Sequence, residues 1–482
     1  MMKVFSIIRV NTMLLAIIAI TMFLPAGTAL FYGETDIFLS FLIPALVAIV
    51  VGVSFFFLGR NKRFKLSSRG GFITVATCWL SASLLGSLPF MISGCIPSFT
   101  DAFFESVSGY TTTGATILSD VESLPRAINL WRAQMHWLGG MGIVALTVAL
   151  LPLFGVGGFQ LIKAETTGPE KGKITPKITE TAKILWFIYF GFTVVQTVLL
   201  MIAGMDFIDA LIHTFSTLGT GGFSSRNSSV GHYNSAAIDW ICTIFMILSG
   251  VNFSLYYKLF QGKFKEIKEN TEFKAYLVIL LVAALLITFS IKPIYGSFFN
   301  TLRYASFQAS TIMTTTGFST ADYTQWPPFA QAIIFFLMFV GGCSGSTGGS
   351  VKVIRWVILG RQMKNEMRRL LHPHGVFGIQ LNERPGRKDV VLNVAGFFYI
   401  YFILVFITSL VASLSNADVI TSFTTGLSLV GNIGPGFGNI GPIYNYSFYA
   451  PWAKWWFSFA MIAGRLEFYT MIVMFMPSFW KK

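Results

Sequence analysis

Four short glycine-centred segments, each flanked by apolar stretches, constrain the fold of this 482-residue chain more than any other feature. Non-helical backbone at membrane depth is tolerated only where protein buries it or where it lines a wet cavity. Four such breaks in one chain therefore predict one shared cavity. The segments are Thr111-Thr112-Thr113-Gly114, Gly219-Thr220-Gly221-Gly222, Thr314-Thr315-Thr316-Gly317 and Ile433-Gly434-Pro435-Gly436.

The composition places most of the chain in a membrane. Hydrophobic residues make up 54% of the chain and charged residues only 12%, whereas soluble proteins carry about 25% charged residues. A helix needs about 20 apolar residues to cross the hydrocarbon core. Runs of that length predict ten spans, at 10–32, 37–58, 71–93, 131–154, 182–204, 236–258, 274–294, 329–356, 391–413 and 452–477.

These spans fall into an N-terminal hairpin, 1–60, and four repeats of one pattern. Each repeat contains a long span, a short apolar segment, a glycine-centred segment and a second long span. The short segments, at 100–109, 206–217, 297–313 and 416–428, cannot cross the membrane and are expected to be re-entrant helices. The chain is therefore predicted to be an all-α integral membrane protein, with pore repeats at 61–155, 156–260, 261–360 and 361–482.

Threonine and glycine suit coordination of a cation by the backbone. Threonine favours an extended backbone with a stiff side chain, and glycine reaches conformations that other residues avoid. Each short helix would also direct its negative C-terminal dipole end at the following segment. None of the four segments contains Asp or Glu, so selection would depend on neutral carbonyl dipoles. The alternative is that the glycines serve loops or helix packing; their fourfold recurrence in one setting favours a filter.

The net charge of +14 does not indicate nucleic-acid binding, because the basic residues occupy alternate connections. Such placement is typical of cytoplasmic loops, and it predicts that both termini are cytoplasmic. Some of these residues are also expected to contact anionic lipid or a docked partner. Most of the 35 Lys and Arg residues lie at the N-terminus, in 60–69, 163–183, 258–274 and 352–388, and at the C-terminus.

A glycine-rich stretch interrupts the predicted span 329–356. It contains Gly341, Gly342, Gly345, Gly348 and Gly349, and glycine weakens a helix by up to about 1 kcal/mol per residue. No Gly-Lys-Ser/Thr sequence closes it, so it does not match a phosphate-binding loop. Two interpretations remain, a tightly packed kinked span or a flexible constriction of the cavity at 341–350.

Arg465, in the middle of the last predicted span, is the most unusual single residue. An intramembrane charge normally faces the protein interior or a wet pathway. Glu467 is a poor partner, because side chains two positions apart on a helix do not face each other. Arg465 is therefore expected either to control a cation path or to join helices through a salt bridge or a carbonyl contact. His136 is expected to be an ordinary interior histidine.

The sequence resembles the Trk/Ktr/HKT superfamily over essentially its whole length, and within it the potassium-translocating subunits of bacterial Trk systems. The N-terminal hairpin is similar to the Trk type rather than to the shorter Ktr type. Besides the glycine-centred segments, the resemblance is carried by His136-Trp137-Leu138-Gly139-Gly140-Met141-Gly142, Lys163-Ala164-Glu165, Ile174-Thr175-Pro176-Lys177-Ile178 and Gly464-Arg465-Leu466-Glu467.

The resemblance implies a single potassium pore in the cytoplasmic membrane. It matches Gly114, Gly222, Gly317 and Gly436 to the filter glycines, residues 341–350 to an intramembrane gating loop, and Arg465 to an arginine beneath the filter. It also implies a homodimer and a docked cytosolic nucleotide-binding subunit of the TrkA type. The second and fourth segments depart from the threonine pattern of the other two.

Potassium uptake through a gated passive pore is thus the leading hypothesis, with potassium as cargo and no bound cofactor. A proton- or sodium-coupled symporter is the alternative. Coupled transporters usually keep carboxylates at membrane depth; Glu467 is a candidate, whereas Glu105 and Asp418 are expected nearer the outer surface. An enzyme is not expected, because the four cysteines and five histidines are scattered and form no nucleophile–base or metal-ligand pattern.

Overall fold

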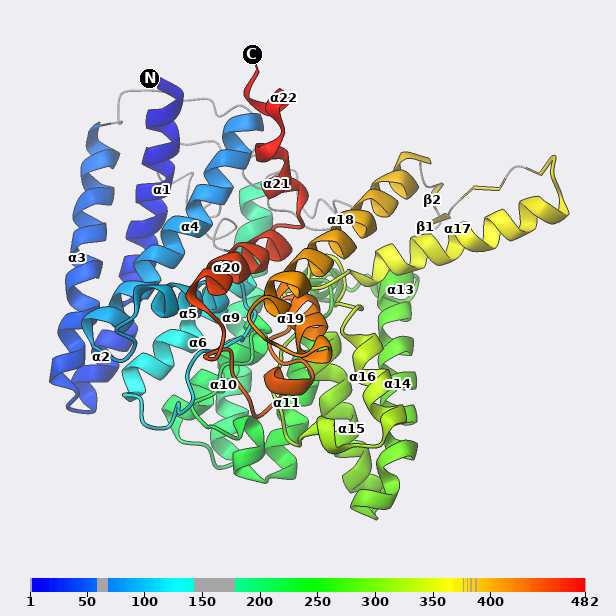
Figure 1. Ribbon diagram of the computed structural model, residues 1–482, viewed down its shortest axis with the longest axis horizontal. Coiled ribbons are helices and arrows are strands. Elements are labelled where there is room, and N and C mark those ends of the chain that lie inside the picture. The colour runs from blue at the N-terminus through cyan, green and yellow to red at the C-terminus, as the bar shows by residue number, and fades with distance from the viewer. Residues whose placement is uncertain are drawn as a thin grey trace.

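The chain folds into a bundle of helices, and its N-terminal and C-terminal ends lie on the same side of the bundle (Figure 1). The structure is a computed structural model that describes residues 2–58, 68–142, 178–375, 377–378, 380–381, 384–385 and 388–481. Apart from one antiparallel pair of short strands, β1 (Gln380–Leu381) and β2 (Arg384–Pro385), the regular elements of this part are helical. The all-α fold is therefore confirmed.

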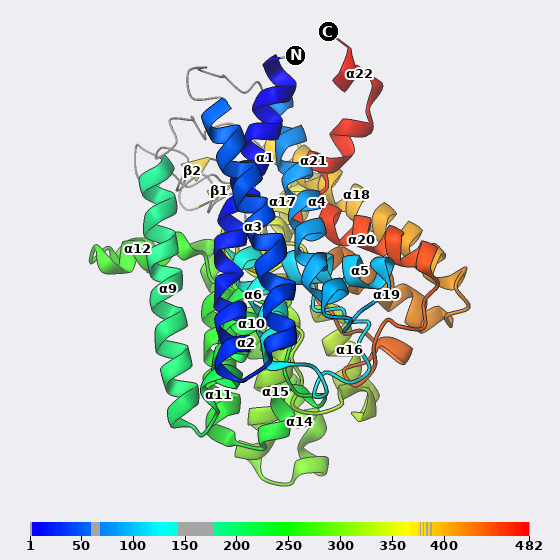
Figure 2. The ribbon, with the colours of Figure 1, turned by 90° about the vertical axis from the view of Figure 1, so that its left-hand side faces the viewer.

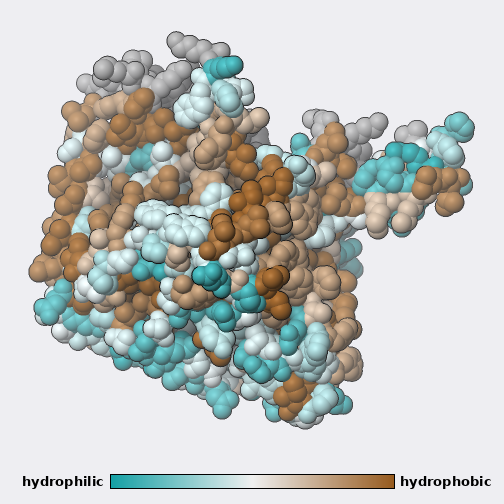
Figure 3. Space-filling view, viewed as in Figure 1, coloured by the Kyte–Doolittle hydropathy of each residue, from teal (hydrophilic) through white to brown (hydrophobic). Residues whose placement is uncertain are grey.

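The N-terminal hairpin packs along one edge of the bundle. It consists of α1 (Met2–Thr21), α2 (Phe23–Phe31) and α3 (Thr35–Leu58). Figure 2 shows these helices running alongside α4, with α9 further along the same face. Exposed Leu46, Val47 and Val50 give α3 an apolar outer surface, and Figure 3 shows apolar surface over this edge of the molecule. Such a surface fits contact with lipid.

After the hairpin, one order of elements occurs four times: a long helix, a short helix, an extended segment and a second helix. The first set is α4 (Ser68–Ile92), α5 (Phe99–Tyr110) and α6 (Arg126–Gly140). The second is α9 (Ile178–Ile202), α10 (Phe207–Gly219), η2 (Ser229–Tyr233), α11 (Ala236–Ser249), α12 (Phe253–Phe260) and α13 (Phe264–Lys268).

The third and fourth sets have the same order, and their second helix is again divided. The third is α14 (Thr271–Tyr295), α15 (Phe298–Met313), η3 (Tyr323–Gln325), α16 (Pro328–Leu337) and α17 (Val353–Leu371). The fourth is α18 (Lys388–Ser413), α19 (Val419–Gly431), η4 (Gly438–Ile440), α20 (Pro451–Arg465), α21 (Tyr469–Ile472), η5 (Val473–Phe475) and α22 (Pro477–Trp480). The four short helices are α5, α10, α15 and α19.

Several predicted spans are not continuous helices. The span 236–258 bends by 92° between α11 and α12, and 452–477 bends by 115° between α20 and α21. The span 329–356 divides into α16 and α17 on either side of an extended stretch. The described residues therefore contain six helices long enough to cross a membrane, or up to eight if each bent pair is one span.

The predicted boundaries of the repeats are only partly covered by the structure. The boundaries near 60 and 155, the second part of the span 131–154, and the motifs at 163–165 and 174–177 lie outside the described residues. The boundary between 360 and 361 falls inside α17. The division at 260 follows the end of α12, so the helix α13 falls into the third predicted repeat.

The hairpin provides a test of close helix packing at Gly52. A Cβ atom there would lie 2.6 Å from Ala16 Cβ and 2.7 Å from the Thr12 carbonyl oxygen. We expect Gly52→Ala to lower the thermal unfolding temperature in detergent, since overpacking costs about 1–3 kcal/mol. Gly191→Ala on α9 is the control, because nothing lies within 4 Å of its Cβ position. A Gly52→Ala protein as stable as its parent would contradict this packing.

Candidate functional site

The four short helices end in the same backbone turn. In each, the first or second residue after the helix has a left-handed conformation, and two N–H groups donate back to carbonyls of the last helical turn, as in a Schellman motif. The left-handed residues are Thr112, Thr220, Thr315 and Asn432, with φ between 53° and 60°. The second bond of each turn runs from Thr113 to Ser108, Gly221 to Ser216, Thr316 to Thr311 and Ile433 to Ser428, at 2.8–2.9 Å.

Three of these left-handed positions carry threonine, a residue that avoids this conformation. A β-branched residue with positive φ is a conformational outlier, and such backbone strain costs about 1–3 kcal/mol per residue. Glycine is the usual residue at this place in a helix end. Strain that persists three times in equivalent turns must be held by the surrounding structure, and strained residues of this kind cluster at functional sites.

Beyond each turn, the chain meets the next segment so closely that only glycine fits. A Cβ atom on Gly114 would lie 2.0 Å from the Gly221 oxygen, and one on Gly222 would lie 2.1 Å from the Thr316 oxygen. A Cβ atom on Gly317 would lie 2.4 Å from the Ile433 oxygen, and one on Gly434 would lie 2.6 Å from the Thr113 oxygen. The first segment touches the second, the second the third, the third the fourth, and the fourth the first. The four segments therefore form a closed ring.

The ring corrects the predicted register of the fourth segment by two residues. Gly434, with φ 97°, occupies the place of Gly114, Gly222 and Gly317, whose φ values are 76°, 80° and 84°. The fourth segment of the ring is thus Gly431-Asn432-Ile433-Gly434, and Gly436 is not the fourth ring glycine. The four ring segments are called the strands of the ring below, although they form no β-sheet. The N–H of Gly436 donates to the Ile440 carbonyl, and its own carbonyl accepts from the Tyr323 hydroxyl. Gly436 and Pro435 therefore belong to the stretch of chain that follows the fourth ring segment. The stretch that follows each ring segment is called its limb.

The ring has the chemistry of a neutral cation site. Each of its four segments brings backbone carbonyl oxygens to the ring, and carbonyl oxygens are ligands that can replace the water of a dehydrated ion. The threonine hydroxyls bond to one another: Thr111 to Thr113, and Thr314 to Thr316, both at 2.8 Å. The C-terminal ends of the four short helices add negative potential at the ring.

The glycine-rich loop 341–350 packs directly against the ring. The N–H of Gly349 donates to the Thr315 hydroxyl at 2.6 Å, and the N–H of Ser350 donates to the Gly431 carbonyl at 2.8 Å. The loop is non-helical and folds back on itself, with a turn at Gly345 (φ 71°) and an isolated bridge between Val340 and Val351. The stretch is therefore not a kinked helix, but its glycines are tightly packed, as the first interpretation expected; a constriction at 341–350 stays a prediction.

Two buried charges hold the loop, and the sequence analysis singled out neither of them. The Glu272 carboxylate accepts from the N–H groups of Ser344 at 2.7 Å and Ile354 at 3.2 Å. The Lys352 ammonium donates to the Gly348 carbonyl. A single acid in the first turn of the apolar α14 was the only sign in the sequence of this role for Glu272.

Arg465 joins the loop to the first repeat. Its guanidinium donates to the carbonyls of Thr347 at 2.6 Å, Gly139 at 2.6 Å and Gly140 at 2.9 Å. Glu467 pairs with Arg355 at 2.5 Å. Arg465 makes the expected carbonyl contact, and its effect on a cation path remains a prediction.

His136 is an interior histidine, as expected. It is fully buried, and its Nδ1 lies 2.8 Å from the Gly109 carbonyl oxygen. A Cβ atom on Gly221 would lie 2.2 Å from its Cγ, so its ring supports the second segment. Among the described residues there is no group of His, Cys, Asp and Glu that could hold a metal, and no disulfide joins the four cysteines.

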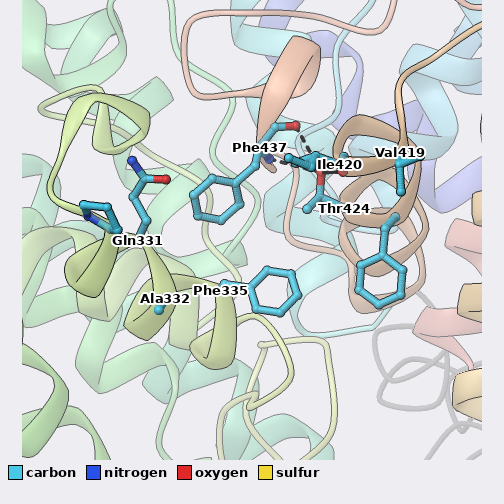
Figure 4. Close-up of a pocket in the computed structure, with 9 residues that line it drawn as sticks. Gln331, Ala332, Phe335, Val419, Ile420, Thr424 and Phe437 are labelled. Atoms are coloured by element: carbon cyan, nitrogen blue, oxygen red, sulfur yellow. Dashed lines mark hydrogen bonds between the residues drawn. The ribbon is translucent and has the colours of Figure 1, made fainter.

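An apolar pocket of about 410 Å³ lies beside the fourth segment, between α16 and α19 (Figure 4). Its two polar side chains are turned to the protein. Gln331 donates to the carbonyls of Thr324 and Trp326, and the Thr424 hydroxyl bonds to the backbone of Phe437. Walls of this kind cannot replace the water around a cation, so the pocket is not part of an ion path. It is lined by Pro328, Gln331, Ala332, Phe335, Val419, Ile420, Phe423, Thr424 and Phe437.

A bundle of apolar helices that gathers four broken segments into a carbonyl ring defines a multi-pass membrane protein of the ion-transport class. Comparison with known proteins agrees. The family model described as "TrkH: Cation transport protein" matches residues 39–303 and 300–482. The chain belongs to this TrkH family of cation transport proteins.

Relatives with this name are similar along their whole length. The Trk system potassium uptake protein TrkH of Halomonas elongata is 39% identical over 487 residues, with 100% of each chain covered. The protein of the same name from Escherichia coli K12 is 39% identical, with 99% of each chain covered. The crystal structure of the potassium transporter TrkH from Vibrio parahaemolyticus superposes with a TM-score of 0.88 at 36% identity, over 100% of both chains.

The corrected register can be tested with two alanine substitutions. We expect Gly434→Ala to abolish monovalent-cation flux into proteoliposomes, because the added Cβ would meet the Thr113 oxygen and φ is positive. Gly436→Ala would meet the flexible end of Ile440 at 2.6 Å, so we expect it to keep most of the flux. The opposite ranking of the two variants would restore the register predicted from the sequence.

Proposed function

We propose that the protein takes up potassium across the cytoplasmic membrane through a gated, channel-like pore whose selectivity filter is the carbonyl ring. The closed ring is the observation that carries this proposal. Its filter residues are the strands Thr111–Gly114, Gly219–Gly222, Thr314–Gly317 and Gly431–Gly434. The family and the names of its similar relatives support potassium as the ion.

The contacts that three buried or partly buried carboxylates make with the protein favour a passive pore over a proton- or sodium-coupled symporter. A coupling carboxylate must exchange its ion or proton during the cycle. Glu105 is fully buried, and it pairs with Arg132 at 2.8 Å. Glu467 pairs with Arg355, and Glu272 accepts two backbone N–H bonds. The membrane potential, worth about 2.3 kcal/mol per charge per 100 mV, then drives uptake.

The gate consists of the loop 341–350 and Arg465. The loop lies against the third and fourth strands of the ring, and Arg465 ties it to the end of α6. A positive side chain that bonds to carbonyls beside a cation path both obstructs the path and repels the ion. Opening requires Arg465 to release Thr347 or the pair Gly139 and Gly140.

Partners are proposed on the side that carries the termini, taken as cytoplasmic. The helix α17 projects from the body there (Figure 1), and its exposed residues include Lys364, Arg368 and Arg369. This basic surface suits an acidic face of a cytosolic nucleotide-binding subunit of the TrkA type. A homodimer in the bilayer completes the proposed assembly.

A serine at Gly114 tests the filter. Its Cβ would strike the Gly221 oxygen, so we expect Gly114→Ser to displace that carbonyl and to lower the potassium-over-sodium uptake ratio in proteoliposomes by about tenfold, the effect of about 1.4 kcal/mol. Gly94→Ser is the matched control: Gly94 has φ +74°, but nothing lies within 4 Å of its Cβ position. Unchanged selectivity in Gly114→Ser would refute the filter assignment.

Removal of the Arg465 side chain tests the gate. We expect Arg465→Ala to raise basal potassium flux by about tenfold or more, since each charge-assisted hydrogen bond contributes about 1.5–3 kcal/mol. Arg465→Lys keeps the charge but loses the planar fork that reaches several carbonyls, so an intermediate flux is expected. Reduced flux in Arg465→Ala, with normal protein yield, would assign Arg465 a structural role instead.

A further inference from the structure

A buried ion pair lies behind the first filter segment. Glu105 is on the short helix α5 and Arg132 is on α6, with side-chain exposures of 0% and 2% and a separation of 2.8 Å. Two charges so deeply buried are costly to desolvate, and such a pair is weak support for stability. A role other than stability is therefore worth testing.

The carboxylate of the pair holds the limb of chain that leaves the first filter strand. The Thr116 hydroxyl donates to Glu105 at 2.9 Å, and the N–H of Ile117 donates to it at 3.1 Å. Both residues follow Gly114 closely in sequence. The position of this limb therefore depends on where the carboxylate lies.

The guanidinium of the pair reaches in the other direction, to the limb that leaves the second strand. Arg132 donates to the Ser224 carbonyl at 3.3 Å, and its guanidinium carbon lies 4.2 Å from the centre of the Phe223 ring. Phe223 directly follows Gly222. The pair thus connects the limbs of the two strands that meet where Gly114 approaches the Gly221 oxygen.

The other three short helices brace their limbs with uncharged groups at the equivalent position, about two helical turns before the left-handed residue. His213 Nε2 lies 3.0 Å from the Ser224 hydroxyl, and Gln308 donates to the Ala321 carbonyl at 3.1 Å. Thr425 bonds to the Tyr449 hydroxyl at 2.7 Å. Of these four equivalent positions, only that of Glu105 carries a residue in an ion pair. Of the contacts named here, only those of the Glu105–Arg132 pair reach the limb of a neighbouring strand.

We propose that Glu105 and Arg132 are positioning residues for ion selectivity, which fix the spacing between the first and second filter strands. This proposal rests on the proposed function of the ring as a potassium filter. The pair is neutral as a unit, so it acts through geometry and not by attracting cations. Its loss should change the discrimination between potassium and sodium more than it changes the total flux.

The test removes both charges together. Glu105→Gln/Arg132→Met avoids leaving one buried charge without its partner, and replacing a whole buried pair is often tolerated. The matched control is Asp239→Asn/Arg303→Met, which removes a pair at 3.3 Å with side-chain exposures of 4% and 13% that joins α11 to α15. The measurement is the ratio of potassium to sodium uptake in proteoliposomes, alongside thermal stability and total flux.

We expect the Glu105/Arg132 double variant to lose at least about threefold in the uptake ratio, since residues in one contact network are coupled to this extent. The Asp239/Arg303 variant should keep the parental ratio. A parental ratio in the Glu105/Arg132 variant, or an equal loss in the control, overturns the proposal.

Arg132→Lys decides the question if the double variant does not fold. Lysine keeps the positive charge beside Glu105, but one ammonium cannot reproduce the fork that reaches both Glu105 and Ser224. We expect a folded protein with a reduced uptake ratio, and a parental ratio overturns the proposal. If Gly114→Ser lowers the ratio while these variants do not, the filter stands and only the role of the ion pair fails. If Gly114→Ser leaves the ratio unchanged, the filter assignment itself fails.

Discussion

The structure depends on the close approach between each ring glycine and a carbonyl oxygen of the next segment. Without a side chain, Gly114 brings its backbone against Gly221, and the same contact repeats around the ring. The approach is possible because each short helix ends in a left-handed residue that turns the chain into the ring. Four helix ends, four left-handed residues, of which three are strained threonines, and four glycines therefore act as one unit, and a change in any strand affects its neighbours.

Buried charges surround this neutral ring rather than forming part of it. Glu105 and Arg132 lie behind the first strand, and Arg465 lies at the loop between the first and third repeats. Glu105 and Arg132 neutralise each other as a pair, whereas the Arg465 guanidinium bonds to backbone carbonyls. In the proposed filter, the pair would therefore fix geometry, and Arg465 would add a positive charge beside the path.

The sequence predicted the short helices well and the broken spans poorly. Periodicity and length placed 100–109 and 297–313 within a residue or so of α5 and α15, because isolated apolar stretches have clear ends. The bend at Gly250 was missed, although Ser249-Gly250 and Asn252 interrupt the apolar run there, and Asn252 caps α12 by accepting from the N–H of Ser254. The register of the fourth strand was missed because Ile-Gly-Pro-Gly offers two glycines, and only the left-handed Asn432 decides between them. Glu272 gave no pattern, because its partners are backbone N–H groups distant in sequence.

The ring closes between its first and last strands, where Gly434 meets the Thr113 oxygen. A chain emerging from the ribosome inserts its N-terminal parts first. The fourth strand, which contacts the first, is therefore made only after almost the entire polypeptide. The closed ring can therefore form only after the fourth repeat has been inserted.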